Sequence, residues 1–164
     1  MKPKHSSVLV GTAGVYFVAA KLAAEGFHAA PTFGNAPSVD ILVGLPDGAA
    51  TLSLQVKTAM HAARTRGKGN NKQWHHYEWD IGKKSARLNK SGLFFAFVNL
   101  KGMEDKLPDV FIVPSPVIYE EFQKYDLKSR VMWHPKLEQA DTYKNRWDIL
   151  REYLLKNSDV QKSE

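Results

Sequence analysis

Cysteine is absent from this sequence of 164 residues, which excludes disulfide bonds, thiolate catalysis and cysteine-ligated zinc or iron–sulfur sites. Long apolar runs are scarce too, and no apolar stretch approaches the roughly 18 residues of a membrane span. The N-terminus leads into no long apolar segment of the kind found in signal peptides. These absences predict a soluble, cytoplasmic protein that makes no contact with a membrane.

Three well-defined catalytic motifs are also missing: the H-E-x-x-H zinc pattern, the G-x-x-x-x-G-K-[ST] phosphate loop and the G-x-S-x-G nucleophile elbow. His75 and His76, followed by Glu78 and Asp80, are of the residue types that ligate metals. Adjacent side chains diverge on a strand or a helix, however, so we interpret the two histidines as surface or DNA-facing residues.

Acidic residues are scarce in one part of the chain. Residues 61–90 contain eight lysines and arginines against two carboxylates, so this segment carries the whole net charge of +6. A basic segment on a neutral body attracts polyanions such as nucleic acids; the alternative is a solvated loop whose lysines serve solubility. The candidate nucleic-acid-binding residues are Arg64, Arg66, Lys68, Lys72, Lys83 and Lys84.

Within this basic segment, the glycine-rich run over 64–72 has no apolar anchor and predicts a mobile loop. Trp74, Tyr77 and Trp79 follow it in the sequence. Their rings suit either stacking on nucleic-acid bases or burial against a sheet, and we favour burial for Trp79 in particular.

Hydrophobic periodicity predicts an α/β domain. A helix is expected over 11–22, with a preceding serine pair as its cap and Gly26 as its stop. The expected strands cover 27–33, 39–45, 51–57, 93–98 and 109–113, and the later helices cover 80–88, 117–125 and 143–154. This order predicts a single domain over 1–156, a mixed β-sheet flanked by helices, followed by a polar tail over 157–164.

A hairpin is the sharpest structural prediction. Asp47-Gly48 separates two β-rich runs, which is the strongest short-range hairpin signal. Pairing symmetric about this turn opposes residues whose numbers sum to 95, so that Asp40 faces Gln55. Lys57 then lies diagonally from Asp40 on the same face, with all three side chains within about 5 to 8 Å of a neighbour.

This trio suggests a site for a hard divalent cation. The Asp40 carboxylate, the Gln55 side-chain oxygen and the Val56 carbonyl are ligands of the kind that Mg²⁺ takes, with waters and substrate phosphate completing the octahedron. Lys57 would then position or activate a water, or stabilise the charge that develops on phosphorus. The alternative is the exposed polar face of an ordinary strand.

These residues resemble the PD-(D/E)XK nuclease superfamily, and within it the small restriction-endonuclease-like and Holliday-junction-resolvase-like proteins. The resemblance rests on Gly11-Thr12-Ala13-Gly14 opening a helix, on Val39-Asp40-Ile41-Leu42-Val43, and on Leu54-Gln55-Val56-Lys57-Thr58 after a short hairpin. It continues through 79–84, 93–100, 111–115 and 147–150, and so covers most of the chain.

The resemblance implies a restriction-endonuclease-like fold and a Mg²⁺ or Mn²⁺ cofactor held by Asp40 and Gln55, with Lys57 as the catalytic lysine. Gln55 stands where most members have Glu or Asp, which makes this chain a Q-x-K variant. Family members often carry a glutamate just after the second glycine of the helix motif, where this chain has Val15. One of the three usual carboxylates therefore remains.

The sequence thus predicts a metal-dependent phosphodiester hydrolase, an endonuclease that acts on DNA by in-line attack of a water that the metal binds. Two alternatives stay open: a nuclease-derived module that binds DNA or RNA without cutting it, and a protein-interaction module whose basic loop meets an acidic partner. Metal-dependent cleavage separates the first from the enzyme, and the salt dependence of nucleic-acid binding separates the second. The sequence leaves open whether the chain forms a homodimer.

Overall fold

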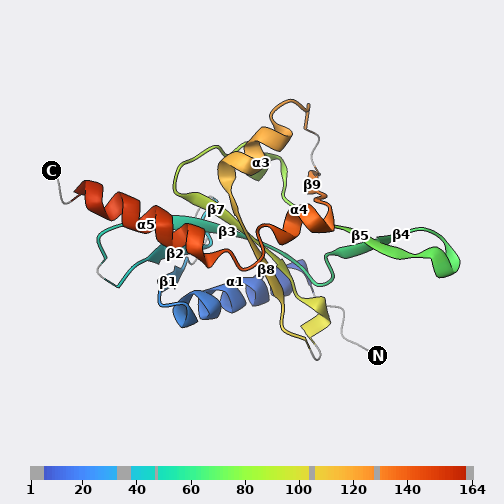
Figure 1. The fold of residues 1–164 in the computed structure, drawn as a ribbon, viewed down its shortest axis with the longest axis horizontal. Helices are drawn as coiled ribbons and strands as arrows, with labels where there is room; N and C mark the ends of the chain where they lie inside the picture. Colours follow the sequence, from blue (N-terminus) through green and yellow to red (C-terminus); the bar gives the residue numbers. More distant parts are fainter. Residues whose placement is uncertain (1–5, 33–37, 47, 104–105, 128–129, 162–164) are drawn as a thin grey trace.

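A five-stranded sheet runs through the middle of the molecule, with its strands in the order β1-β2-β3-β7-β8 (Figure 1). The computed structural model describes residues 6–32, 38–46, 48–103, 106–127 and 130–161. The strands are β1 (His28–Pro31), β2 (Ile41–Gly44), β3 (Thr51–Ala59), β4 (Ala63–Arg66), β5 (Gln73–Tyr77), β6 (Trp79–Asp80), β7 (Leu93–Asn99), β8 (Asp109–Pro114) and β9 (Met132–Trp133). The helices are α1 (Ser7–Ala24), α2 (Lys83–Ala86), α3 (Ser115–Phe122), α4 (Leu137–Asp141) and α5 (Trp147–Gln161), with short 3₁₀ turns at Gly69–Asn71 and Lys101–Met103.

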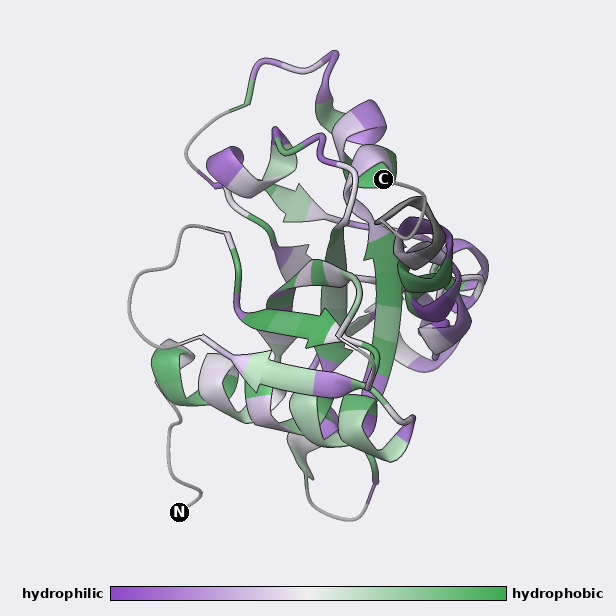
Figure 2. Cartoon of the chain, turned by 90° about the vertical axis from the view of Figure 1, so that its left-hand side faces the viewer, coloured by the Kyte–Doolittle hydropathy of each residue, from purple (hydrophilic) through white to green (hydrophobic). Residues whose placement is uncertain are grey.

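The sheet is mixed, as the sequence predicts. β1, β2 and β3 pair antiparallel in succession, β3 pairs parallel with β7, and β8 pairs antiparallel with β7. Every residue of β7 is buried, because helices or small strands cover both faces of the sheet at its centre. Figure 2 shows the resulting concentration of hydrophobic colour in the central strands. The predicted class, an α/β domain with a mixed sheet flanked by helices, is confirmed.

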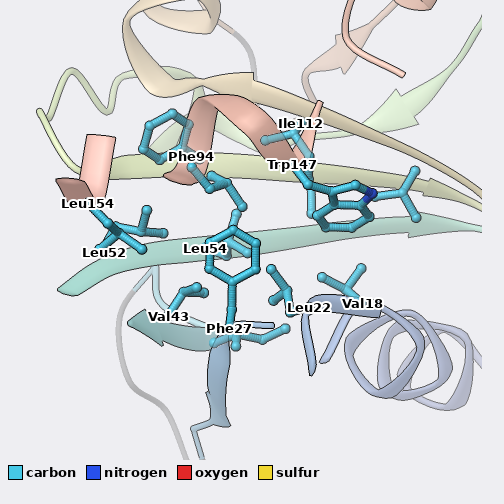
Figure 3. Packing of buried hydrophobic residues seen from close by; sticks show 14 of the residues in the cluster. Val18, Leu22, Phe27, Val43, Leu52, Leu54, Phe94, Ile112, Trp147 and Leu154 are labelled. Atoms are coloured by element: carbon cyan, nitrogen blue, oxygen red, sulfur yellow. The ribbon is translucent and has the colours of Figure 1, made fainter. Parts of the chain in front are cut away.

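One face of the sheet is covered by α1 and α5 (Figure 3). Val18 and Leu22 of α1 and Leu154 of α5 are fully buried, in one cluster with Leu52 and Leu54 of β3. Burying a side chain of this size stabilises the fold by about 1.5–3 kcal/mol. The helical spacing of these residues therefore determines which side of each helix faces the sheet.

The other face carries an aromatic cluster. Phe97 of β7 is fully buried, and its ring centroid lies 4.3 Å from that of Trp133 in β9. Trp79 of β6 stacks on Trp133 at 5.8 Å, and its indole N–H donates to the Val98 carbonyl oxygen at 2.9 Å. These contacts hold the small β6–β9 sheet, together with α3 and α4, against this face.

Helix α1 has the predicted capping residues. Ser6 Oγ accepts a hydrogen bond from the Leu9 N–H at 3.3 Å, and Gly26 takes a left-handed φ of 84° just after the helix ends. By length and composition alone α1 is also a candidate membrane span, which corrects the expectation that no apolar stretch approaches that length. Core helices of soluble proteins meet the same criterion, so this finding assigns the chain to no compartment.

Two helices differ most from the sequence prediction. α5 continues to Gln161, into the segment expected to be a polar tail, and Ser158 within that segment is buried. The helix predicted over 80–88 is reduced to the four residues of α2, because its first residue pairs with β9 instead. Phe33, the end of the predicted first strand, and residues 162–164 lie outside the described residues.

The contact between α1 and β3 leads to a stability prediction. A Cβ at Gly14 would lie 2.8 Å from Thr58 Cγ2 and closer still to Thr58 Oγ1, inside van der Waals contact. Gly14→Ala should therefore destabilise the protein, because overpacking typically costs about 1–3 kcal/mol. The higher helix propensity of alanine, worth about 1 kcal/mol, offsets part of this loss. Urea denaturation measures the net change in the free energy of unfolding.

Gly11 provides a matched control on the same helix, because a Cβ there meets nothing within 4 Å. Gly11→Ala should stabilise the protein by up to about 1 kcal/mol through helix propensity alone. Adding Thr58→Ala to Gly14→Ala should recover part of the loss, since it removes the two side-chain atoms beyond Thr58 Cβ. Equal effects of the two glycine substitutions would contradict a tight contact at Gly14.

Candidate active site

The β2–β3 hairpin has the register that the sequence predicts. Ile41 pairs with Leu54, and the residue numbers of every pair along the two strands sum to 95. Just before β2, the Asp40 N–H donates to the Leu54 carbonyl oxygen at 2.8 Å, which is one residue out of this register. Asp40 therefore lies beside Leu54 at the end of the paired region, and its place directly opposite Gln55 stays a prediction. Asp47, in the predicted turn, lies outside the described residues.

Gln55 and Lys57 share one face of the sheet, and the Asp40 carboxylate lies near them. Leu54 is buried in the cluster beneath α1 and α5, so strand alternation directs its neighbour Gln55 to the opposite, aromatic face. Lys57 is two residues beyond Gln55 on β3 and points the same way. The Asp40 charge acts on the Lys57 amine, so the two groups are close together, as the predicted site requires.

The two oxygen-bearing side chains differ in their hydrogen bonding. Asp40 Oδ2 accepts a hydrogen bond from the Val56 N–H at 2.7 Å, which fixes the carboxylate beside β3. Gln55 is only 9% exposed, and its Oε1 atom has no hydrogen-bond partner among the residues that the structure describes. Leaving a buried carbonyl oxygen unpaired costs about 1–3 kcal/mol. Gln55 Oε1 therefore marks a position at which a bound ligand would be stabilising.

Lys57 is the third member of the trio. Burial lowers the pKa of its amine below the usual 10.5, because the ammonium is withdrawn from water; the charges of Asp40 and Asp80 raise the pKa again, by less. The sequence analysis did not assign Asp80 to this group. The sequence did contain a signal, because the apolar residues Trp79 and Ile81 flank Asp80 in the alternation typical of a strand. In the structure these two are buried while Asp80 is exposed.

Removing the Asp80 charge should lower the pKa of Lys57 further. Asp80→Asn takes away a carboxylate that favours the ammonium, whereas Asp80→Glu keeps it, and NMR titration of the Lys57 side chain in metal-free protein measures both. Because the folded pKa lies below the unfolded value, the protein's stability should rise with pH between the two. That rise should begin at lower pH in Asp80→Asn. An unchanged Lys57 pKa would contradict the proximity of Asp80.

The donor set provides fewer carboxylates than a self-sufficient metal centre. Within the described ranges, no three His, Asp or Glu side chains gather closely enough to hold a metal ion. The Asp40 carboxylate and the unpartnered Gln55 oxygen are nonetheless hard oxygen donors, and Mg²⁺ commonly binds through one or two carboxylates plus waters and substrate phosphates. These residues fit a cation whose coordination the substrate completes.

The segment predicted to be a mobile loop forms a β-hairpin instead. β4 pairs antiparallel with β5, and the Gly69–Asn71 turn closes its tip. Figure 1 shows the two green strands extending from the body of the molecule. The prediction of an irregular loop was wrong, because it relied on missing apolar residues, whereas backbone pairing forms this ribbon and buried Tyr77, stacked on Trp79, anchors its base. The mobility of its tip stays a prediction. Residues 63–77 are termed the arm below.

The basic residues of the arm fall into two groups. Arg66, Lys68 and Lys72 are exposed, and their side chains have no hydrogen bond or ion pair to any residue described here. Arg64 donates a hydrogen bond to a backbone carbonyl and lies 3.6 Å from a carboxylate oxygen of Glu78. Arg64 therefore helps to hold the base of the arm, and the other three are free to meet a polyanion.

Helix α2 carries the remaining predicted basic residues. Lys83 and Lys84 are both exposed, and in the described part of the chain neither has a partner. Arg87, just after the helix, is structural instead: its guanidinium donates at 2.7–3.3 Å to three backbone carbonyls at and beyond the end of α3. Most of the free charge of the basic segment thus lies on the arm and on α2.

His75 and His76 meet, which corrects the expectation that they diverge. A register shift on the β4 side places Arg64 opposite His76 and Thr65 opposite Trp74, so His75 is an extra, bulged residue. As a result the Nδ1 atoms of the two histidines lie 3.0 Å apart. The expectation of divergence assumed a regular strand.

Trp74 and Trp79 differ in exposure. Trp79 is buried, as the sequence analysis favoured, while Trp74 on the arm is 66% exposed and free to stack on a partner.

Val15, at the position of the glutamate that family members often carry, packs against the cluster beneath α1 and α5, on the sheet face opposite Gln55 and Lys57. The structure therefore does not bring residue 15 to the trio, and Asp80 is the second carboxylate whose charge reaches Lys57.

No protein-family profile matches this sequence, and a search of curated proteins finds no match. A search of solved structures finds a bacterial homing endonuclease, I-Ssp6803I, with a TM-score of 0.58 and 16% sequence identity, covering 98% of this chain and 100% of that one. At this identity the likeness concerns the fold. The chain thus shares a nuclease-like fold, a five-stranded mixed sheet flanked by helices, with a homing endonuclease.

Proposed function

We propose that this protein is a metal-dependent endonuclease that acts on DNA, a Q-x-K variant of the PD-(D/E)XK superfamily. The observation that carries the proposal is that the Asp40 carboxylate, the unpartnered Gln55 oxygen and the half-buried Lys57 amine lie close together beside β3. The fold shared with a homing endonuclease and the free basic residues of the arm support the same class of substrate.

In this proposal Asp40 and Gln55 hold Mg²⁺ or Mn²⁺, which supplies Lewis-acid stabilisation of charge on a phosphoryl oxygen. The Val56 N–H presets the orientation of the Asp40 carboxylate, so little reorganisation is needed when substrate arrives. Lys57 Nζ orients the attacking water and donates hydrogen bonds to the negative charge that develops on the phosphate. Its partial burial strengthens these interactions, because water screens them less.

A cleavage assay tests the proposal directly. Purified protein is incubated with duplex, single-stranded and branched DNA and with RNA, in Mg²⁺, in Mn²⁺ and in excess chelator. We expect cleavage of DNA that requires the metal and is absent with chelator. Cleavage that persists in chelator would overturn the assignment of a metal to Asp40 and Gln55.

A second candidate function is a nuclease-derived module that binds nucleic acid without cutting it. The small carboxylate complement of the site favours this alternative, because a single carboxylate beside an amide binds Mg²⁺ weakly in the absence of substrate. Salt-dependent binding without metal-dependent cleavage would identify this module. Absence of both would favour an acidic protein as the partner of the basic surface.

A further inference from the structure

The arm is a two-stranded ribbon that leaves the body of the protein. All residues over 65–74 are exposed, and the arm contains four lysines and arginines and no carboxylate. Its contacts with the body are confined to its base, where Tyr77 is buried beside Trp79 and Arg64 is paired with Glu78. Because the ribbon protrudes and carries only positive charge, its shape and charge suit a groove in a negatively charged partner.

The pairing register gives the arm two chemically different faces. Ala63, Thr65, Trp74 and Tyr77 occupy one face; except for Thr65, they line a cavity of about 420 Å³ at the base of the arm. The other face presents Arg64, Arg66, Gln73 and His76, which are hydrogen-bonding side chains. The ribbon therefore has an aromatic side that lines the cavity and a polar side. At the base of the polar side Arg64 and His76 contact Glu78 and His134, and nearer the tip it carries Arg66 and Gln73.

Arg66 and Gln73 stand out on the polar face. They pair directly across the two strands, near the tip, and both are exposed. Neither side chain has a hydrogen bond or ion pair within the residues described, in contrast to Arg64 on the same face. Their side chains lie about 5 Å apart, since they are directly opposed.

We propose that the arm enters the major groove of duplex DNA and that Arg66 and Gln73 read the edges of one or two adjacent base pairs there; this rests on the proposed function. The major groove of B-DNA admits a two-stranded β-ribbon. Arginine forms two hydrogen bonds with the edge of guanine, and glutamine forms two with adenine. Lys68 and Lys72, at the tip, contact the phosphates on either side.

The reach of the arm places this contact near the cleavage site. Arg66 is nine positions after Lys57, which limits the distance between their Cα atoms to about 30 Å even for a fully extended chain. One turn of B-DNA spans about 34 Å. The base pairs that Arg66 and Gln73 read therefore lie within one helical turn of the phosphate bound at Asp40 and Lys57.

Selection from a duplex library with randomised positions, in metal-free buffer, tests the proposal. Wild-type protein should prefer particular bases, and Arg66→Lys and Gln73→Ala should each relax the preference by about 5- to 150-fold at one or two adjacent positions. Because Arg66→Lys keeps its charge and Gln73 has none, the salt slope of binding should stay unchanged. Both side chains are exposed, and equal melting temperatures confirm that the variants fold.

Lys68→Gln is the matched control at the tip of the same arm. It should lower the salt slope by about 0.9 and leave the base preference intact, because it removes one phosphate contact. If the protein binds duplex DNA without base preference, or if both variants keep the wild-type preference, the proposal that Arg66 and Gln73 read bases is overturned. The proposed endonuclease activity is unaffected by either result. Preference for single strands would also overturn it. Absence of both DNA binding and cleavage would overturn the proposed function as well.

Discussion

Asp40→Asn should reduce the rate of metal-dependent cleavage by more than about 100-fold. Mutation of residues that only hydrogen-bond to a metal's ligands typically lowers activity by about 10- to 100-fold, and Asp40 is proposed to bind the metal directly. Asparagine is nearly the same size and keeps a side-chain oxygen that can accept the Val56 N–H hydrogen bond. The substitution therefore removes the charge with little change to the hairpin. Initial rates on a DNA substrate over a Mg²⁺ titration measure the loss.

Asp40→Ala separates the chemical role of this residue from its structural role. It should lose cleavage to the same extent but should also destabilise the protein by about 1–3 kcal/mol, since the Val56 N–H is left without its partner. Neither variant should weaken DNA binding in metal-free buffer, and both should strengthen it slightly, because a negative charge near the phosphates is gone. Full cleavage by Asp40→Asn would contradict the proposed site.

Neutralising lysine pairs on the basic surface should change how DNA binding depends on salt. If each residue contacts one phosphate of duplex DNA, Lys68→Gln with Lys72→Gln should lower the log–log salt slope by about 1.8. Lys83→Gln with Lys84→Gln should lower it by a similar amount. Fluorescence anisotropy at several salt concentrations measures these slopes, and the loss should be the same for all DNA sequences.

The matched control is an equal change of charge elsewhere. Lys21 of α1 and Lys156 of α5 lie on the helices that cover the opposite face of the sheet and belong to neither the arm nor α2. The double substitution of these two residues by glutamine should leave the slope nearly unchanged, because charges farther than about 8–10 Å from the phosphates are screened. Arg64→Gln should also change the slope less than a tip lysine does, since Arg64 is already paired with Glu78. Equal slopes for all pairs would mean that net charge, and not a defined surface, attracts DNA.

The candidate site was largely predictable because its geometry is local. The arrangement of a two-stranded hairpin depends mainly on its register. The residues of the turn and the alternation of the strands determine that register. This placed Gln55 and Lys57 on one strand face with Asp40 beside the same strand, and the structure has Asp40 bonded to Val56 between them. The catalytic and metal-binding roles of these residues remain predictions.

Other features depended on contacts between distant parts of the chain. The arm has almost no apolar alternation, and its strands form because backbone pairing and the buried Tyr77 anchor compensate for that. Asp80 influences Lys57 because β6 is carried against the sheet by aromatic packing with Trp133. Alternation around Asp80 indicates which side of β6 it occupies, but no local pattern indicates which part of the chain either element packs against.

The sequence by itself determined the class of fold, the hairpin register and the charge of the segment over 61–90, since each follows from spacing or composition within a short stretch. Only the tertiary structure decided which charges are free, which carboxylate accompanies Lys57 and which sheet face Val15 occupies. Those outcomes depend on how separate elements pack on the sheet, and packing is a property of the whole folded chain.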